Sequence, residues 1–243
     1  MIVTIHQPLL FPWLGYLDRM ARADLFVVLD HVQFERGNYQ NRARYLHEGE
    51  PRWLTVPVHQ RSQKERILDK EVDHGAAGKT PWGPAAFNTL RQAYRDAPFF
   101  HAYAEPVEAI LKARWTRLAD LTLASMRLAR EAFRIDTPMI RSSELAVHGA
   151  KSDLVLAICK AVGASKFLGG MGGSRRYLDA AAFERAGIAV EWQEFAHPVY
   201  SQRGAKAFVP GLSSLDLLFN CGPLAREILF RRAAPLAVTE EPA

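Results

Sequence analysis

The chain has 243 residues, 49% of them hydrophobic and 23% charged, enough for one large domain or two small ones with a core that needs no metal or disulfide support. Cys159 and Cys221 form neither a disulfide framework nor a metal-ligand pair, and the sequence shows no leader and no apolar run of about 18 residues, so we expect a soluble, cytoplasmic protein that does not bind membranes. The formal net charge of +5 fits anionic substrates, while the basic residues are too dispersed to predict nucleic-acid binding.

The first 30 residues predict a β-α-β unit. Residues 1–7 ("MIVTIHQ") and 24–30 ("DLFVVLD") are β-branched and apolar, which is typical of buried strands. Residues 13–23 carry apolar side chains at helical spacing. Two continuously apolar strands joined by a helix indicate a parallel sheet.

The rest of the chain alternates between strand-like and helical segments. Helical patterns fill residues 85–134, and we expect this stretch to form an insert. The sequence favours an α/β fold, with a mostly parallel sheet flanked by helices in a Rossmann-like arrangement. We expect a single domain over residues 1–232 and a flexible C-terminal tail at 233–243. The other predicted elements are a loop at 31–51, strands at 52–58, 137–145, 165–170 and 188–195, and helices at 151–164, 174–187 and about 215–219.

Polar or glycine residues follow several of the predicted strands. In an open parallel sheet, ligands bind beyond the carboxyl ends of the strands. If the strands are parallel, these groups lie along one edge of the sheet, and we expect the site there. The groups are His6 with Gln7, Asp30 with His31, His59, Gly169 to Ser174, and His197.

The stretch "HQPLLFPWLGY" joins the first predicted strand to the first predicted helix. His6 can bind an anion or act as an acid or base, although a histidine at a strand end can also simply form hydrogen bonds in the core. Gly15 allows a backbone or a ligand to approach closely. We expect His6 and Gln7 to face a ligand and Trp13 and Tyr16 to form its wall, with a purely structural role for the two aromatic rings as the alternative.

The segment "DHVQFERGNYQNRARY" mixes carboxylate, amide and guanidinium side chains. Arginine is well shaped for bidentate contact with phosphate or carboxylate. The density of amides favours recognition, and a solvated loop with surface ion pairs is the alternative. The candidate residues of this segment are Asp30, Gln33, Gln40, Asn41 and Arg42.

Four glycines surround one methionine in "LGGMGGSRRYLD". Glycines between a strand and a helix allow backbone N–H groups to face an anion at the helix N-terminus. The pattern matches neither the P-loop nor the dinucleotide fingerprint, and a plain tight turn is the alternative. The candidate residues are Gly169, Gly170, Gly172, Gly173 and Ser174.

The last polar cluster precedes an apolar helix. His197, Tyr200, Gln202 and Arg203 are its candidate binding residues. Asp216 lies within the apolar helix that follows, where an unpaired carboxylate would be costly. We therefore expect Asp216 to bind an arginine or a histidine.

These segments, in this order, resemble the WbqC-like family over nearly the whole chain, from the first strand to "NCGP". The resemblance is carried by "HQPLLFPWLGY", "DHVQFERGNYQNRARY", "WLTVPV", "GGMGGSRRYL", "HPVYSQ" and "FVPGLSSLDLLFN". The chain departs from the family pattern at His31, where a second acidic residue is common, and at Asn38-Tyr39, where Ser-Trp is common. We therefore expect no metal at this position. The residues that match the family's motifs are His6, Gln7, Pro8, Trp13, Gly15, Tyr16, Asp30, Gln33, Phe34, Asn41, Arg42, Gly169, Gly170, His197, Pro198, Tyr200, Asp216 and Asn220.

The resemblance implies a group-transfer enzyme of polysaccharide or natural-product biosynthesis. It would form an amide or ester by moving an acyl or aminoacyl group from coenzyme A, or from the phosphopantetheine of an acyl carrier protein, to a small amine-bearing acceptor. Either candidate histidine would be the base, and Asn41 or the glycine-rich turn would stabilise the oxyanion. Arg42 and Arg203 would bind the donor. The expected catalytic set is His6, Asp30, Asn41 and His197.

Two alternatives remain open. The opening strand, turn and helix also resemble the start of nucleotidylyltransferases, which predicts binding of ATP with magnesium and an adenylated intermediate. The second histidine of that signature is absent, and Tyr16 stands near its place. The other alternative is a non-catalytic module that binds a substrate or carrier protein, and such a module would not need the catalytic set to converge.

Overall fold

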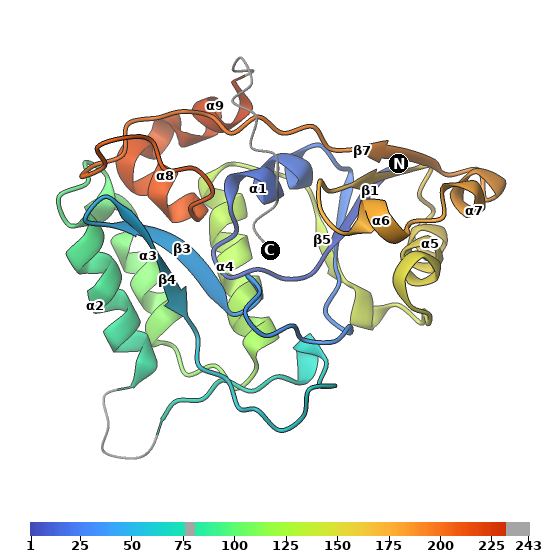
Figure 1. Cartoon of the computed structure of the whole chain (residues 1–243), viewed down its shortest axis with the longest axis horizontal. Coiled ribbons are helices and arrows are strands. Elements are labelled where there is room, and N and C mark those ends of the chain that lie inside the picture. The colour runs from blue at the N-terminus through green and yellow to red at the C-terminus, as the bar shows by residue number, and fades with distance from the viewer. Residues whose placement is uncertain (76–80, 232–243) are drawn as a thin grey trace.

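A computed structural model describes residues 1–75 and 81–231, and its main feature is a five-stranded sheet (Figure 1). All neighbouring strands are parallel, in the order β5-β2-β1-β6-β7. The predicted α/β fold with a parallel sheet is therefore confirmed. The strands are β1 (Ile2–His6), β2 (Leu25–Val28), β5 (Met139–Arg141), β6 (Lys166–Gly169) and β7 (Ala189–Trp192).

The sheet is doubly wound around β1. From β1 the chain proceeds to β2 and β5 on one side, and then crosses to β6 and β7 on the other side. The strand order therefore reverses between β1 and β6, which pair through Ile2↔Lys166 and Val3↔Phe167. Such a reversal is the topological switch point at which open α/β sheets bind ligands.

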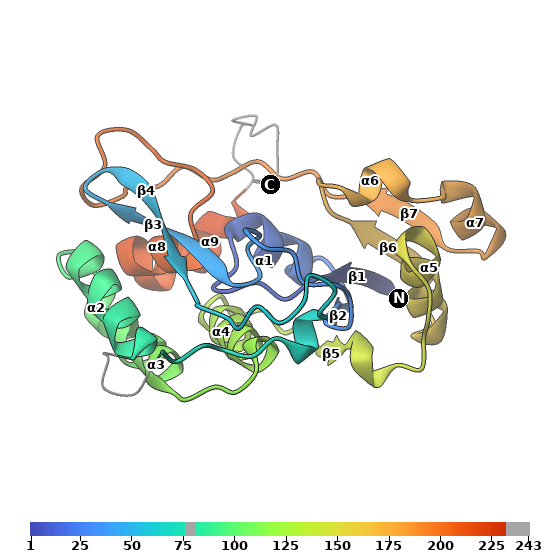
Figure 2. The same ribbon diagram turned by 60° about the horizontal axis from the view of Figure 1, so that its bottom comes forward.

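Helices cover both faces of the sheet. One face packs against α1 (Leu14–Ala21) and α4 (Leu118–Ala132), and the other packs against α5 (Lys151–Ala161) and α7 (Ala180–Arg185). Figures 1 and 2 show the strands between these two pairs of helices. Because side chains alternate along a strand, β2 contributes to both cores, with Phe26 and Val28 on one face and Val27 on the other.

The predicted helical insert is present. It consists of α2 (Trp82–Tyr94), α3 (Phe100–Lys112) and α4. Two C-terminal helices, α8 (Ser214–Cys221) and α9 (Ala225–Phe230), pack beside it, and one continuous hydrophobic core joins this part of the chain to α1 and the sheet.

The predicted third strand at residues 52–58 does not belong to the main sheet. Instead β4 (Glu50–Thr55) pairs antiparallel with β3 (Arg42–His47), within the segment that we expected to be a loop. Glu48 and Gly49, with φ of 54° and 79°, form the two-residue turn between the strands. His59 therefore follows a separate hairpin and does not extend from a strand of the parallel sheet.

The predicted helix at 174–187 is interrupted. It consists of α6 (Ser174–Tyr177) and α7, because the Asp179 side chain accepts a hydrogen bond from Ala182 N at 3.1 Å and caps a new helix. The single-domain interpretation of residues 1–232 stays a prediction, and the tail predicted at 233–243 lies outside the described residues. Three short 3-10 helices complete the described part of the chain, at Ile67–Asp69, Ser142–Glu144 and Gly222–Leu224.

Candidate functional site

The carboxyl ends of the parallel strands bring three of the predicted groups to one edge of the sheet. His6 and Gln7 follow β1, Asp30 and His31 follow β2, and the glycine-rich turn at 169–173 follows β6. The first and third groups flank the switch point. We therefore take the edge between β1 and β6 as the candidate site.

His6 is a neutral imidazole at the end of β1. Its Nδ1 lies 2.9 Å from the carbonyl oxygen of Gln7, and because a carbonyl can only accept, Nδ1 carries the proton. Nε2 is then a hydrogen-bond acceptor, and the described part of the chain supplies no partner for it. The ring meets Tyr16 edge-on, with centroids 5.0 Å apart. Burial, aided by the positive charge of Arg19, lowers the pKa of His6 from 6.5 to about 3.

A chain of two amides fixes the orientation of Gln7. The backbone N–H of Glu35 donates to Gln40 Oε1 at 3.0 Å, so the other end of the Gln40 amide is the nitrogen. That nitrogen donates to Gln7 Oε1 at 2.8 Å. The remaining Gln7 atom, Nε2, carries two N–H donors, and no described residue accepts from it. Gln7 therefore presents a hydrogen-bond donor beside the switch point.

Helix α1 adds a buried positive charge that we did not predict. Arg19 is only 3% exposed, and its charge acts on His6 and also on Tyr16, where it opposes the rise in pKa that burial causes. Gln193, after β7, donates to Gly15 O at 2.8 Å and to Asp18 Oδ2 at 2.7 Å. Arg19 lies three residues after Tyr16 on the same face of the helix, and this spacing is the signal that could have identified it.

Gly169 is required by packing at the end of β6. A Cβ at this position would lie 2.4 Å from the Trp192 ring, so the indole of β7 occupies the space beside the strand. The glycine thus allows two neighbouring strands to pack closely. Its absent side chain opens no space for a ligand.

The glycine-rich turn becomes more exposed from Gly170 to Gly173. Gly170 is buried, Gly172 is half-buried, and Gly173 is exposed with no atom within 4 Å of a Cβ position. Ser174 begins α6, which has four residues. A helix this short supplies little of the dipole that the predicted anion site requires, so free backbone N–H groups are the main contribution of this turn.

Trp13 belongs to the core. A Cβ on Gly15 would lie 2.1 Å from the indole, and Phe195 meets the indole edge-on at 5.6 Å. Gly15 therefore makes room for Trp13, and the indole is only 7% exposed. Tyr16 is also buried, and its hydroxyl donates to Gln7 O at 3.2 Å, so it stabilises the turn that follows β1.

Asp30 connects the ends of β2 and β5. It is fully buried, and its Oδ2 pairs with Arg141 Nε at 2.5 Å and accepts from Ser143 Oγ at 2.8 Å. Its Oδ1 accepts from Ser143 N at 3.0 Å and from Ser142 Oγ at 3.2 Å. Because all of its lone pairs are occupied, the carboxylate is built to position this edge of the sheet. Within residues 1–75 and 81–231, no group of three or more His, Cys, Asp or Glu side chains is arranged to hold a metal ion.

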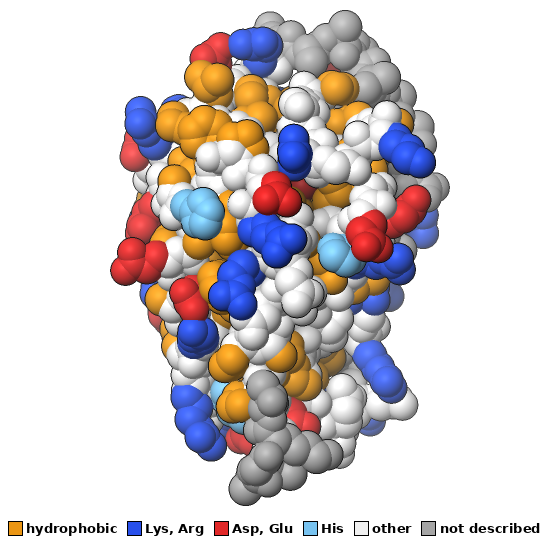
Figure 3. Space-filling model, turned by 90° about the vertical axis from the view of Figure 1, so that its left-hand side faces the viewer, with side chains coloured by type: hydrophobic (Ala, Val, Ile, Leu, Met, Phe, Trp, Pro, Cys, Tyr) orange, Lys and Arg blue, Asp and Glu red, His pale blue; other side chains and the backbone are white. Residues whose placement is uncertain are grey.

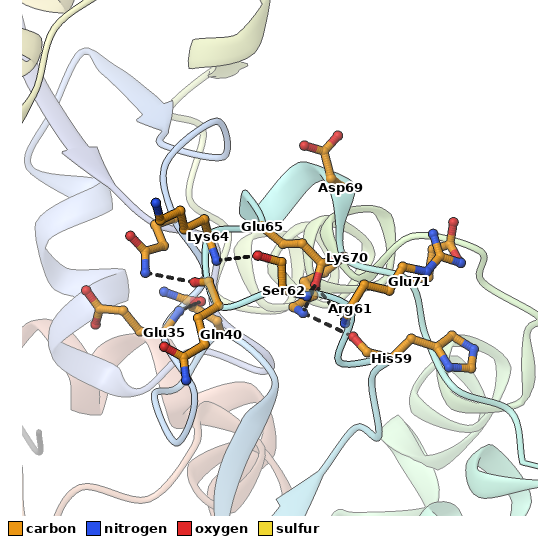
Figure 4. A network of polar contacts seen from close by, with 12 residues as sticks. Glu35, Gln40, His59, Arg61, Ser62, Lys64, Glu65, Asp69, Lys70 and Glu71 are labelled. Atoms are coloured by element: carbon orange, nitrogen blue, oxygen red, sulfur yellow. Dashed lines mark hydrogen bonds and ion pairs between the residues drawn. The ribbon is translucent and has the colours of Figure 1, made fainter.

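A buried lysine secures the loop that follows the hairpin (Figure 4). Lys70 is 1% exposed, donates to His59 O at 3.0 Å and forms an ion pair with Glu65. His59 itself is exposed. Gln33 donates to Gln63 O at 2.8 Å on the surface of the same loop. Gln33 thus ties this loop to the segment after β2.

Asn41 and Arg42 lie at the start of β3. Asn41 Nδ2 donates to Val56 O at 2.9 Å, so this amide closes the base of the hairpin. The Arg42 guanidinium stacks on Trp53 at 3.9 Å, and this indole is 40% exposed. Figure 3 shows the left-hand side of Figure 1, where basic, acidic and apolar side chains are interspersed. Basic residues form no continuous stripe on that face.

His197 holds a turn in the C-terminal part of the chain. It is 2% exposed; its Nδ1 donates to Pro198 O at 2.9 Å, and its Nε2 accepts from Gly211 N at 3.2 Å. Burial lowers its pKa. Because backbone groups occupy both ring nitrogens, this geometry gives no support to a role as general base.

Asp216 is the centre of a buried network, and our expectation of an arginine or histidine partner was wrong. The carboxylate accepts from Tyr94 OH and Tyr200 OH, both at 2.8 Å, and from Gln202 Nε2 at 2.9 Å. Burial raises the pKa of the Asp216 carboxyl. Tyr200 and Gln202 thus serve this network, while the exposed Arg203 contributes a backbone N–H to the side chain of Asn220 at 2.8 Å.

The four residues of the expected catalytic set share no hydrogen bond. His6 binds within its own turn, Asp30 binds β5 and the 3-10 helix after it, Asn41 binds the hairpin, and His197 binds the turn near residue 211. The switch point instead collects His6, Gln7 and the glycine-rich turn, with Gln40 orienting Gln7 from the side.

The strand order and the polar edge define a doubly wound α/β protein whose switch point lies between β1 and β6. The chain belongs to the WbqC-like protein family, whose sequence model matches residues 7–228, and this confirms the resemblance. A curated relative, "Uncharacterized protein Rv1507c" of Mycobacterium tuberculosis, is 28% identical over 229 residues, which cover 93% of this chain and 96% of that protein. No solved structure matches the chain. None of the described helices is long and apolar enough to cross a membrane.

Proposed function

We propose that this protein is a cytoplasmic group-transfer enzyme that binds the phosphate-bearing part of a nucleotide donor at the switch point. The observation that carries the proposal is the reversal of strand order between β1 and β6, with polar residues after β1 and a glycine-rich turn after β6. Open α/β sheets bind nucleotides in the crevice beyond such a reversal.

The chemistry of the edge supports a phosphate ligand. Gln7 Nε2 offers two N–H donors, and the glycine-rich turn adds backbone N–H groups, with open space around the Cβ position of Gly173. The buried charge of Arg19 makes the potential near His6 more positive. A fixed positive charge and oriented donors at the end of parallel strands favour a bound anion.

Nucleotidyl transfer from ATP is the reaction that this geometry supports best. In such a step an acceptor oxygen attacks the α-phosphorus, and the bond to pyrophosphate breaks. Catalysis of phosphoryl-type transfer relies mostly on positioning and on stabilisation of charge. A histidine with a pKa of about 3 is a weak base for an amine, but it can still position a ligand through Nε2.

Acyl or aminoacyl transfer from coenzyme A or an acyl carrier protein to an amine is the second candidate. The exposed Gly173, with open space above its Cα, favours it because a thioester oxygen could approach the backbone N–H groups of this turn. Coenzyme A also carries a phosphorylated nucleotide, so either donor would bring phosphates to the switch point. A non-catalytic module that binds a carrier protein would need no nucleotide at the switch point.

A ligand screen with matched variants tests the proposal. The melting temperature of the full chain is measured with ATP and magnesium, coenzyme A, acetyl-coenzyme A and a nucleotide sugar, since binding to the native state raises it by mass action. Gln7→Glu keeps the acceptor for Gln40 and replaces the free N–H donors with a negative charge. We expect it to abolish the shift, and Gln60→Glu, an exposed control, to retain it.

The outcomes distinguish the candidates. A shift with ATP and magnesium that Gln7→Glu removes supports nucleotidyl transfer, and one confined to coenzyme A thioesters supports acyl transfer. A shift of equal size in Gln7→Glu would place the ligand elsewhere. The absence of any shift, together with binding of a carrier protein, would contradict nucleotide binding and support the non-catalytic module.

A further inference from the structure

A pocket lies away from the edge of the sheet, between the insert and the C-terminal helix α9. Its volume is about 680 Å³, which is within the range of small-molecule sites. It is lined by Tyr103 of α3, by Arg134 after α4, by Arg226 and Phe230 of α9, and by Arg231 directly after α9. None of these residues contributes to the switch point, so the pocket is independent of the proposed nucleotide site.

The Arg226 guanidinium is held rigidly in this pocket. Its Nη1 donates to the carbonyls of Phe133, at 2.8 Å, and of Arg134, at the C-terminal end of α4. The Phe230 ring lies 5.1 Å from the guanidinium carbon. No described residue accepts a hydrogen bond from Nη2 or Nε of Arg226. A guanidinium fixed in this way loses little further entropy when its free N–H groups bind an anion.

The pocket has an excess of positive charge. Three arginines line it, against a single glutamate, Glu227, whose carboxylate pairs with Arg231 at 2.6 Å. The Arg134 side chain forms no hydrogen bond or ion pair with the described residues. Two positive charges therefore remain without a lining carboxylate to balance them, and this favours an anionic ligand.

The aromatic side chains add an apolar wall. Phe230 and Tyr103 are both half-buried, so part of each ring is available to a ligand. Inorganic phosphate alone would leave this wall uncovered. A ligand that joins an anionic group to a flat apolar part would use both features, because burial of the apolar part adds to the binding of the charge.

We propose that the pocket between α3, the end of α4 and α9 binds an organic anion in which a phosphate or carboxylate is joined to an aromatic or aliphatic group. The arginines bind the charged group, and the aromatic rings contact the apolar part. This gives the protein a second ligand site besides the switch point.

Isothermal titration calorimetry of the full chain with 2-naphthyl phosphate tests this site. We expect Arg134→Gln and Arg231→Gln each to weaken binding by about tenfold, the effect of losing one charge-assisted hydrogen bond. Arg127→Gln removes the same charge from an exposed position of α4 outside the pocket and leaves affinity unchanged. Gln7→Glu, which blocks the proposed nucleotide site, also leaves it unchanged.

Two further probes check the chemistry. Inorganic phosphate and 2-naphthol should each bind at least tenfold more weakly than the joined probe, because each lacks one of the two features. Equal binding to wild type, Arg134→Gln and Arg231→Gln would overturn the proposal, as would an affinity for inorganic phosphate equal to that for 2-naphthyl phosphate. Loss of binding in Gln7→Glu alone would also overturn it and would assign the probe to the switch point.

Discussion

Replacing Tyr94 with phenylalanine removes one hydroxyl that joins two buried groups. The hydroxyl accepts from the backbone N–H of Leu46 at 2.8 Å and donates to Asp216 Oδ1 at 2.8 Å. A buried polar group that loses its partner costs about 1 to 3 kcal/mol. The Asp216 carboxylate keeps Tyr200 and Gln202 as donors, so the cost of losing the Tyr94 donor is at the lower end of that range. We therefore expect Tyr94→Phe to lower the free energy of unfolding by about 2 to 4 kcal/mol.

Urea unfolding followed by circular dichroism measures this difference, provided that the dependence on urea is the same in both proteins. Tyr177→Phe is the matched control, because this tyrosine is 43% exposed and we expect a change within about 0.5 kcal/mol. A double-mutant cycle of Tyr94→Phe with Asp216→Asn should show a coupling energy, since the two groups are bonded. If Tyr94→Phe is as stable as the control, the network does not contribute to stability and our reasoning is refuted.

Three further predictions concern the sheet edge. Folding lowers the pKa of His6 from 6.5 to about 3, so the stability that depends on its neutral ring is complete above pH 6.5 and is lost as the pH falls toward 3. Urea unfolding between pH 7 and pH 4 should therefore show a steeper fall in the free energy of unfolding for wild type than for His6→Gln. Equal slopes would contradict the burial of the ring. Gly169→Ala should destabilise the protein by about 1 to 3 kcal/mol, because the added methyl group overpacks against the Trp192 indole, whereas Gly173→Ala should be nearly neutral. A lower melting temperature for Gly173→Ala than for Gly169→Ala would exclude this explanation. Asp30→Ala should lower the free energy of unfolding by about 3 to 5 kcal/mol, because Arg141 and the serine donors lose their acceptor. Calorimetric or urea unfolding measures this difference, and a variant as stable as wild type would disprove the prediction.

The sequence was sufficient to predict the elements whose signal is local. β1, β2 and β6 are short apolar runs, and the insert has helical periodicity over three helices, so both could be identified without tertiary information. Strand β3 could not, because Arg42 and Arg44 made the segment polar and no short apolar run marked it. Its pairing depends on the turn at Glu48-Gly49, where a non-glycine residue adopts positive φ.

The same distinction applies to the site. The placement of His6 and Gln7 at the sheet edge followed from one topological rule, and the parallel sheet confirms that placement. The partners of Asp216 could not be predicted, because Tyr94 lies 122 residues earlier in the chain. The partners of Asp30 could not be predicted either, because Arg141 lies 111 residues later in the chain. Which polar residues are saturated by the fold, and which remain available to a ligand, depends on such distant contacts.

The central strand has a consequence for how the protein is made. β1 is synthesised before β6, one of its two neighbours, and the bond from Thr4 Oγ1 to Leu168 O spans 164 residues. A nascent chain therefore carries β1 with one edge unpaired until β6 has been translated. Unpaired edges of this kind promote association between chains, and sheets with distant partners form slowly. The two sides of the switch point therefore meet only after β6 has been made, and until then the exposed strand is open to the misassembly that long-range pairing permits.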